Sequence, residues 1–538
     1  MTEEKDYGIV DSSSSIALFQ AKEMKKRLIC LLLLSAVGLL PLLSENSPSS
    51  SEGESPARKK KTGRAFIEMG GLMAYSTLNY WRIYGKFIED WQFQLTWKDQ
   101  KQKFFSFEGL RLDSNAFKSN WTHGLSGALY YSFARTNGLN SRESFLFSLG
   151  GSLFWEYFTE WREVSSINDH IFTSFGGPAI GEPLFQISSY FSGKHGFWNR
   201  AAEVFFNPIQ ALNDLLDGNF RKGRHSSFPE AWHQFNFLVG PQQGRLSTDD
   251  QGYTRTDLGL QMRMITIPEY GKPGEFSEFR NDPLSSDLFF DIGFGSREME
   301  EFNAATKTML FGYWKQRLTE TANGGMSGYS LSLGASSAFD LMKKKALVWY
   351  DASQGGLSDP RFPRLTPTVF NDKLAVISII GPSLDLTLFS PRSRFRWSAD
   401  AFFDFALVNS LPLNDYSKTH DLTGTKTTIL SWGYYYALGY TLSSAMEFDS
   451  GPWQWQGSAK YQHYNSIQGL DRFQEIITND FSLVDTRLIY RMSIGYHLRQ
   501  TPLGFQIGFQ RIERSGAIGE FSRRNRENRW YYQLSLGF

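Results

Sequence analysis

The sequence predicts an all-β fold, an outer-membrane antiparallel β-barrel of about 12–14 strands with an α-helical block inserted near the N-terminus. From residue 235 onward, apolar and polar residues alternate in runs longer than the usual strand of about 5–6 residues. Aromatic residues make up 16% of the chain and gather at the ends of the apolar faces, as a membrane-interface girdle requires. The chain ends in RWYYQLSLGF, an amphipathic strand whose last residue is Phe538.

Each alternating run places apolar side chains on one face and polar residues or glycine on the other. The polar face suits a wet lumen, because it offers no second apolar surface for a packed core. Runs that share one apolar face include Leu258–Met264, Leu288–Phe294, Phe395–Leu407, Trp432–Leu442, Leu488–Leu498 and Trp530–Leu536. In the last strand Leu534 and Leu536 are therefore predicted to face lipid, and Gln533 and Ser535 the lumen. The barrel is assigned to residues 219–538.

The N-terminal residues 1–44 predict an export signal. Lys25, Lys26 and Arg27 precede an apolar core from Leu28 to Leu43, and a polar Ser/Pro/Glu tract follows. A single anchoring helix is the alternative, although the core is shorter than the roughly 20 residues of a span. Residues 45–64 predict a flexible linker. The one cysteine, Cys30, lies in the signal core, so the mature protein has no disulfide or thiolate chemistry.

Residues 65–112 are predicted to contribute an N-terminal hairpin to the barrel. The stretch Trp91–Trp97 alternates cleanly, and Phe104–Leu112 does so in part. The intervening KDQKQK is polar enough to connect two strands.

Residues 113–218 predict a helical block. One helix extends from about Ser119 to Gly138, and a second from about Ser141 to Glu163. Pro178 suits the first turn of a third helix, and a last helix, Asn199–Asp217, is expected to kink or split at Pro208. The second helix is aromatic nearly all round, except for one polar seam of residues four apart: Ser144, Ser148, Ser152, Glu156 and Glu160.

Several motifs of this block resemble the bacterial family DUF3943, a domain of unknown function. They are WEYFTEW, SINDHIFTSFGGPAIGE, NPIQALNDLLDG and the pattern of histidine, tyrosine and glycine from His123 to Gly138. The resemblance covers about residues 113–218. It implies an exported protein, for the most part located in the outer membrane, and it brings no established activity.

The polar residues His123, Glu156, Glu160, Asp169 and Glu182 are the candidate site. A histidine beside carboxylates can act as a general base or a metal ligand, so these residues are the candidate catalytic group of a hydrolase. We expect His123, Glu156 and Glu160 to meet between helices, with Asp169 and Glu182 near the rim of that cluster. The same residues also suit a buried hydrogen-bond network that joins the helices, and this structural interpretation is favoured. The metal is left unknown.

Three classes of function stay open. The first is a barrel with helices packed in or under it, serving structure or passage; the second is an outer-membrane hydrolase acting on lipid or a surface polymer. The third is a scaffold that presents its helices to a partner. A net charge of +1 gives no reason to expect nucleic acid, and motifs for a nucleotide cofactor are absent. The expected partners are membrane lipid and the outer-membrane barrel assembly machinery, in the bacterial cell outer membrane.

Overall fold

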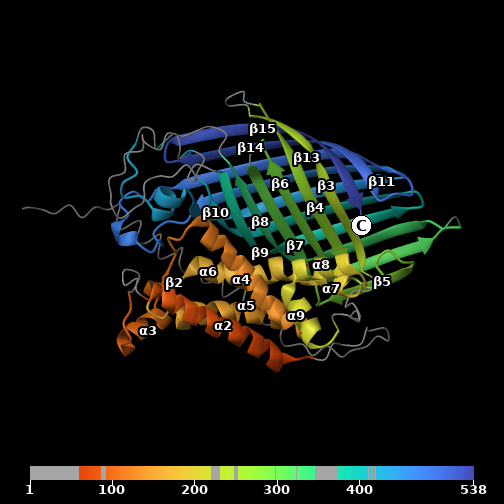
Figure 1. The fold of residues 1–538 in the computed structure, drawn as a ribbon. Helices are drawn as coiled ribbons and strands as arrows, with labels where there is room; N and C mark the ends of the chain where they lie inside the picture. The colour runs from red at the N-terminus through yellow and green to blue at the C-terminus, as the bar shows by residue number, and fades with distance from the viewer. Residues whose placement is uncertain are drawn as a thin grey trace, which may run out of the picture.

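A barrel with a layer of helices beside it forms the molecule (Figure 1). The computed structural model describes residues 60–85, 92–219, 231–246, 252–296, 298–322, 324–345, 372–409, 412, 416 and 420–537. The export signal predicted at 1–44, the linker residues before 60 and Phe538 lie outside the described residues.

Long antiparallel strands close into a ring. The 13-stranded sheet consists of a closed ring of 12 strands plus β5 (Gly274–Arg280), which pairs only with the far end of β7. Pairing of β15 with β3 and of β7 with β8 completes the ring, and the predicted barrel class is confirmed. The ring strands are β3 (Trp232–Leu246), β4 (Gly252–Ile265), β6 (Ser285–Phe294), β7 (Met299–Glu320), β8 (Met326–Lys344), β9 (Asp372–Ser390), β10 (Ser393–Val408), β11 (Tyr435–Ser450), β12 (Trp453–Ser466), β13 (Leu483–His497), β14 (Leu503–Ile518) and β15 (Phe521–Gly537).

Alternate side chains of these strands point into and out of the ring. In β15, Leu534 is 59% exposed on the outside, whereas Gln533 is 3% exposed and lines the interior. The same alternation places Met492 outside and Arg491 inside in β13. The run predicted to begin at Trp432 is shorter than expected: β11 begins at Tyr435, and Trp432 ends the π-helical turn η7 (Thr428–Trp432).

Helices occupy the described chain before β3. They are α2 (Thr62–Tyr84), α3 (Trp97–Phe105), α4 (Phe117–Thr136), α5 (Ser141–Phe154), α6 (Ile167–Gly176), α7 (Glu182–Ser192), α8 (Phe197–Phe206) and α9 (Pro208–Leu216). Of these described helices, none has both the length and the apolar character to cross a membrane.

The hairpin predicted at 65–112 is wrong. Residues 62–84 form α2, which begins inside the predicted linker, and KDQKQK lies within α3 rather than between strands. The Thr96 side chain caps α3 by accepting a hydrogen bond from the Asp99 N–H at 3.2 Å. Residues 92–95 of the alternating stretch form no strand, Thr96 caps α3 and Trp97 begins it. The described β-structure of this segment is the short parallel pair β1 (Leu110–Arg111) and β2 (Ser165–Ser166), with an isolated bridge from Leu112 to Asp471.

The second predicted helix is confirmed as α5, which continues through the π-helical turn η4 (Trp155–Thr159). The third predicted helix begins earlier than Pro178, because the Ser166 side chain caps α6 by accepting a hydrogen bond from the Asp169 N–H. It continues without a break through the π-helical turn η5 (Gly177–Gly181), which contains Pro178, into α7. The split at Pro208 is confirmed, since α8 ends at Phe206 and α9 starts at Pro208.

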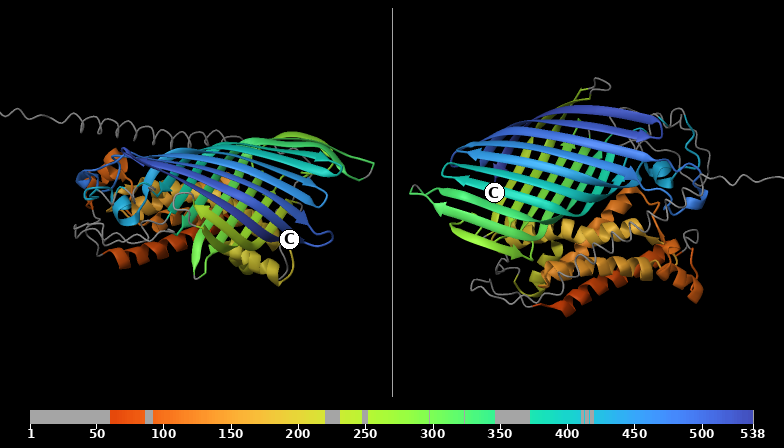
Figure 2. Two further views of the ribbon diagram at one scale, coloured as in Figure 1. Left: turned by 90° about the horizontal axis from the view of Figure 1, so that it is seen from above. Right: turned by 180° about the vertical axis from the view of Figure 1, so that it is seen from behind.

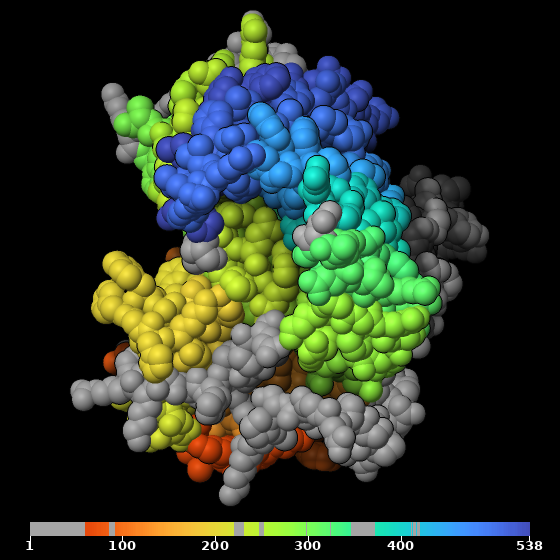
Figure 3. All heavy atoms as spheres, turned by 90° about the vertical axis from the view of Figure 1, so that its right-hand side faces the viewer, coloured from red at the N-terminus to blue at the C-terminus, as the bar shows by residue number. Residues whose placement is uncertain are grey.

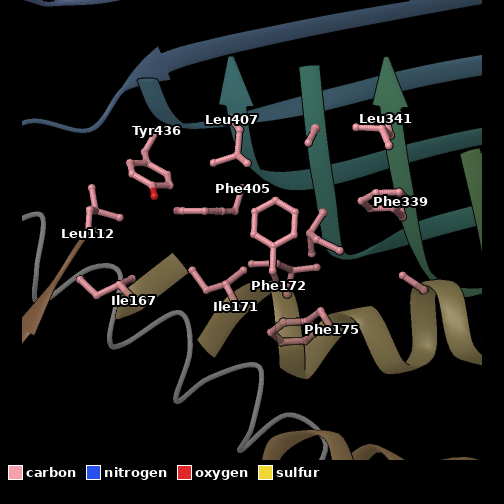
Figure 4. Close-up of a cluster of buried hydrophobic side chains, with 14 of the residues drawn as sticks. Leu112, Ile167, Ile171, Phe172, Phe175, Phe339, Leu341, Phe405, Leu407 and Tyr436 are labelled. Carbon is pink, nitrogen blue, oxygen red and sulfur yellow. The ribbon is translucent and has the colours of Figure 1, made fainter. Parts of the chain in front are cut away.

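The helices lie against the outside of the barrel wall, so the expectation that they are packed in or under the barrel is wrong. In β8, Phe339 and Leu341 contact the helices, whereas their neighbours Ala338 and Asp340 line the interior. Figure 4 shows Phe405 of β10 beside Phe172 of α6, with Phe339 and Leu341 of β8 in the same buried cluster. The C-terminal half of α7 covers the outer faces of β3 and β4 in the same way, through Tyr190 and Phe235.

The two ends of the barrel differ (Figures 1 and 2). One end carries the connections 345–371, 409–434 and 467–482, and the other carries short turns, the chain end and the connection 266–284, which contains β5. At the long-loop end Leu422, Ile429 and Leu430 fold inward onto interior residues such as Val376 and Tyr464. At the short-turn end, seen in Figure 3 as a hollowed face, Tyr270 reaches Thr387 of β9 at 3.0 Å. Both mouths are narrowed by these segments.

The close approach of α4 and α6 generates the first prediction. A Cβ at Gly127 of α4 would lie 1.8 Å from the Thr173 carbonyl oxygen of α6, so Gly127→Ala must force the helices apart. We expect the free energy of unfolding to decrease by about 1–3 kcal/mol. This decrease should appear as a lower melting temperature of the helical circular dichroism signal. Gly150→Ala in α5 is the matched control, because nothing lies within 4 Å of its Cβ. Equal effects of the two changes would contradict the prediction.

Candidate functional site

Four of the five predicted site residues gather where α4, α5 and α6 meet near the long-loop end. His123 of α4 places Nε2 3.4 Å from Oδ2 of Asp169 in the first turn of α6. Glu156 of η4 is buried and accepts a hydrogen bond from the Ser166 N–H at 2.6 Å through Oε2. Glu160 follows one turn later and accepts from the Trp155 indole N–H at 2.8 Å. We name His123, Glu156, Glu160 and Asp169 the Asp169 cluster.

Asparagine amides connect the Asp169 cluster to the barrel. Asn168 donates to Oδ1 of Asp169 at 2.8 Å and to Oδ1 of Asn120 at 2.7 Å. Asn120 in turn donates to the hydroxyl of Tyr434, the residue immediately before β11, at 2.6 Å. Neither asparagine was among the predicted site residues, although Asn168 lies in the quoted SINDH motif. The network therefore joins two helices to the wall.

Burial governs the protonation of the cluster. Desolvation raises the pKa of Glu156 well above its ordinary value, and the charge of Asp169 adds to this effect. The pKa of Asp169 is raised for the same first reason, with Asp113 and Glu160 as further causes. Desolvation lowers the pKa of His123 to about 4. The cluster thus favours neutral acids beside a neutral imidazole, and hydrogen bonds hold it together.

Lys103 of α3 is a member that sequence reasoning missed. Its ammonium group is buried and donates to the Glu156 carbonyl oxygen at 2.7 Å and to that of Glu160 at 2.5 Å. A cation at the carbonyl end of a helix is favoured by the helix dipole. Burial lowers its pKa to about 8. The wrong assignment of KDQKQK to a hairpin turn hid this contact.

Glu182 belongs to a separate site within the helical layer. Arg135 of α4 binds it with two hydrogen bonds, from Nε at 2.7 Å and from Nη2 at 2.9 Å. The Tyr131 hydroxyl donates to it at 2.7 Å, and the Gln186 amide at 3.0 Å. Burial would raise the pKa of Glu182, but Arg135 and these donors hold it below its ordinary value. The expectation that Glu182 lies near the rim of the other cluster is therefore wrong.

Neither group offers a metal site. Within the ranges that the structure describes, no three histidine, cysteine, aspartate or glutamate side chains are grouped as a metal ion would need. The described oxygens of Glu182 are all hydrogen-bonded, whereas Oε1 of Glu156 is buried and has no partner among the described residues. What both groups do in this structure is hold helices in place.

These residues lie in a region with a recognisable relative. Residues 109–209 match the family model described as Domain of unknown function (DUF3943). The resemblance seen in the sequence is confirmed, and the DUF3943 region extends from β1 through α8 to the first two residues of α9. No curated protein matches the sequence.

The barrel is similar to solved outer-membrane structures. A TodX monoaromatic hydrocarbon channel mutant shares 9% identity, covering 57% of this chain and 90% of its own, with a TM-score of 0.23. OmpT of Vibrio cholerae shares 7%, covering 57% and 99%, with a TM-score of 0.20. The translocator domain of the autotransporter NalP from Neisseria meningitidis shares 9%, covering 62% and 98%, with a TM-score of 0.19. No function is inferred from such distant likenesses.

A second candidate site is the interior of the barrel. A cavity of about 530 Å³ is lined by acidic and basic side chains in nearly equal measure. Several ion pairs cross it: Arg263 of β4 meets Glu447 of β11 at 3.1 Å, on the opposite side of the ring. Lys344 of β8 meets Glu527 of β15 at 2.6 Å. The charged lining residues are Asp257, Arg263, Asp287, Asp291, Glu301, Lys307, Asp340, Lys344, Asp372, Arg396, Asp400, Glu447, Lys460, Arg487, Arg491, Glu527 and Arg529.

The two carboxylates of the DUF3943 region should respond differently to the same substitution. Glu182→Gln leaves the buried Arg135 without its counter-charge, so we expect a loss of roughly 3 kcal/mol or more. Glu156→Gln keeps an acceptor for the Ser166 N–H and replaces an acid that is neutral in the folded protein, so we expect a change in stability within about 1 kcal/mol at pH 4, where the unfolded glutamate is also largely protonated. Thermal melting followed by circular dichroism measures both.

The pH dependence has a defined sign. The pKa of Glu156 in the folded protein lies above its ordinary value of 4.5, so the free energy of unfolding falls as the pH rises above 4.5. Wild type should therefore lose stability relative to Glu156→Gln from pH 4.5 upward. Equal melting temperatures for Glu182→Gln and wild type, or a Glu156→Gln difference that does not vary with pH, would contradict these assignments.

Proposed function

We propose that the protein is an integral barrel of the bacterial outer membrane whose lumen admits ions or small polar solutes. The observation that carries this proposal is the charged interior cavity inside a wall with an apolar exterior. A closed ring leaves no strand edge with unpaired backbone N–H and C=O groups, and such groups are costly to expose to the hydrocarbon of a bilayer. The polar interior remains hydrated in such a location.

The lining supports a pathway with weak charge preference. Cations and carboxylates alternate around the lumen and pair across it, so their fields largely cancel. The cross-lumen pairs and the inward-folded segments at both mouths limit the solute to a small size. A small neutral or zwitterionic solute fits this lining better than a strongly charged one.

The hydrolase alternative stays a prediction. Its candidate residues, the Asp169 cluster and Glu182, are engaged with Ser166, Asn168 and Arg135, and this favours the structural role. Turnover of phospholipid by the purified protein, lost in His123→Ala, would favour the hydrolase instead. Recognition of the last strand by the barrel assembly machinery also stays a prediction.

Membrane insertion is tested by neighbouring residues at the middle of β14. Phe509 faces outward and contacts Trp530, whereas Gln510 lines the cavity. Phe509→Lys places a charge in lipid at a cost of about 2–4 kcal/mol at mid-bilayer, so the amount of assembled protein in outer-membrane fractions should decrease. Gln510→Lys should assemble normally. Heat-dependent gel mobility reports assembly, and equal defects would refute the assigned facing.

Passage is tested by two lumen variants of opposite sign. Arg263→Gln leaves an excess of negative charge and should shift the reversal potential toward cation selectivity, whereas Glu447→Gln should shift it toward anions. The measurement is current across planar bilayers in a KCl gradient. Arg499→Gln, in an exposed turn, is the control and should behave as wild type. Absence of conductance, or unchanged selectivity in both lumen variants, would refute the passage proposal.

A further inference from the structure

Helix α9 has its polar and apolar faces reversed relative to a water-soluble protein. Gln210, Asn213 and Asp214 are buried, with Asp214 at 0% exposure, while Leu215 on the opposite face is 61% exposed. The buried groups have partners: Asn213 donates to the Thr136 hydroxyl at 3.0 Å, and Gln210 donates to that of Ser192 at 3.2 Å. In water a helix buries its apolar face. The reversal indicates that this surface faces an apolar medium.

Other outer helices repeat the reversal. In α8, Glu203 is buried whereas Trp198 and Phe205 are exposed. The polar seam of α5 is turned inward, where Ser148 donates to the Gly127 carbonyl oxygen at 2.9 Å. Apolar side chains of the outward-facing helices that are exposed are Phe66, Ile67 and Leu78 of α2, Leu146, Leu153 and Phe154 of α5, Phe197, Trp198 and Phe205 of α8, and Leu212, Leu215 and Leu216 of α9.

This apolar surface is continuous with the bare wall of the barrel. On β3, Phe237 is exposed and lies opposite Leu536 of β15, which is also exposed. Two residues earlier on the same face, Phe235 is covered by Phe191 of α7 at a ring distance of 5.8 Å. Phe191 in turn stacks on Phe206 of α8 at 6.2 Å. A path of aromatic side chains therefore leads from the outer face of the wall onto the helices.

We propose that the outer surface of the helical layer, formed by α2, α5, α8 and α9, is covered by lipid acyl chains. This proposal rests on the membrane location proposed above and extends it to the helical layer, which then lies within the lipid beside the barrel. Lipid is the occupant that the geometry favours, because the surface continues the bare barrel wall and the buried polar faces leave no polar rim for a protein interface. Charged residues lie at the two ends of α2 instead: Lys61 and Arg64 pair with Asp217 after α9, and Arg82 is exposed in the last turn of α2.

Quenching by labelled lipid tests the proposal. Cys30 is the one cysteine of the chain, so Cys30→Ser provides a background for single cysteines. Bimane is attached to Phe205→Cys and Leu216→Cys on the helices, to Met492→Cys on the bare wall and to Arg499→Cys in a turn. All four positions are exposed, so the changes should leave the fold intact. Each protein is placed in nanodiscs of phosphatidylcholine with or without brominated acyl chains.

We expect brominated lipid to quench the Phe205 and Leu216 labels as strongly as the Met492 label, and iodide in the buffer to quench only the Arg499 label. Labels at Phe205 and Leu216 that respond to iodide like Arg499 would overturn the proposal. Protection from both quenchers would also overturn it, because a second copy would then cover the surface. Absence of quenching by brominated lipid at Met492 as well as at Phe205 and Leu216 would instead refute the membrane location on which both proposals rest.

Discussion

The pairing of β15 with β3 is the interaction on which the rest of the structure depends. It joins the end of the chain to the first ring strand, from Gly537 opposite Asn236 to Glu527 opposite Leu246. Without it two rows of backbone donors and acceptors would be unpaired, at a cost that neither lipid nor an apolar helix face could offset. Closure also defines an inside and an outside. The interior ion pairs and the exterior helix contacts both exist because each strand has one face on either side.

The barrel class was accessible from sequence because side-chain direction in a strand has a period of two residues. The assignment of Leu534 outward and Gln533 inward needed nothing else, and it is correct. The position of the helices against the outside of the barrel could not be predicted from the sequence. Phe339 in β8 faces a helix and Met492 in β13 faces the open exterior, yet both are large apolar residues in alternating runs. Alternation reports that a side faces an apolar environment without distinguishing lipid from protein.

The candidate site was predicted in part for a similar reason. The four-residue spacing placed Ser148, Ser152 and Glu156 correctly on one face, and the short side chains of SSIND supplied the Ser166 cap. The grouping of Glu182 with the others failed, because its partner Arg135 lies forty-seven residues earlier in the chain. Long-range pairing leaves no local pattern. Lys103 was missed because a short alternating stretch before it suggested a strand, whereas the Thr96 cap decides for a helix.

The one-sided helical layer makes the perimeter of the molecule unequal. The outer faces of β8, β9 and β10 toward the long-loop end are sheathed by α4 and α6, while α7 covers the start of β3 and the end of β4. Exposed apolar side chains of the wall concentrate on β11, β12, β13, β14 and β15, from Tyr440 to Leu536. In a membrane, a neighbouring protein would reach the strands that no helix covers mainly along that arc. Neighbouring proteins in a crowded membrane would therefore contact this protein preferentially on one side, the side without helices.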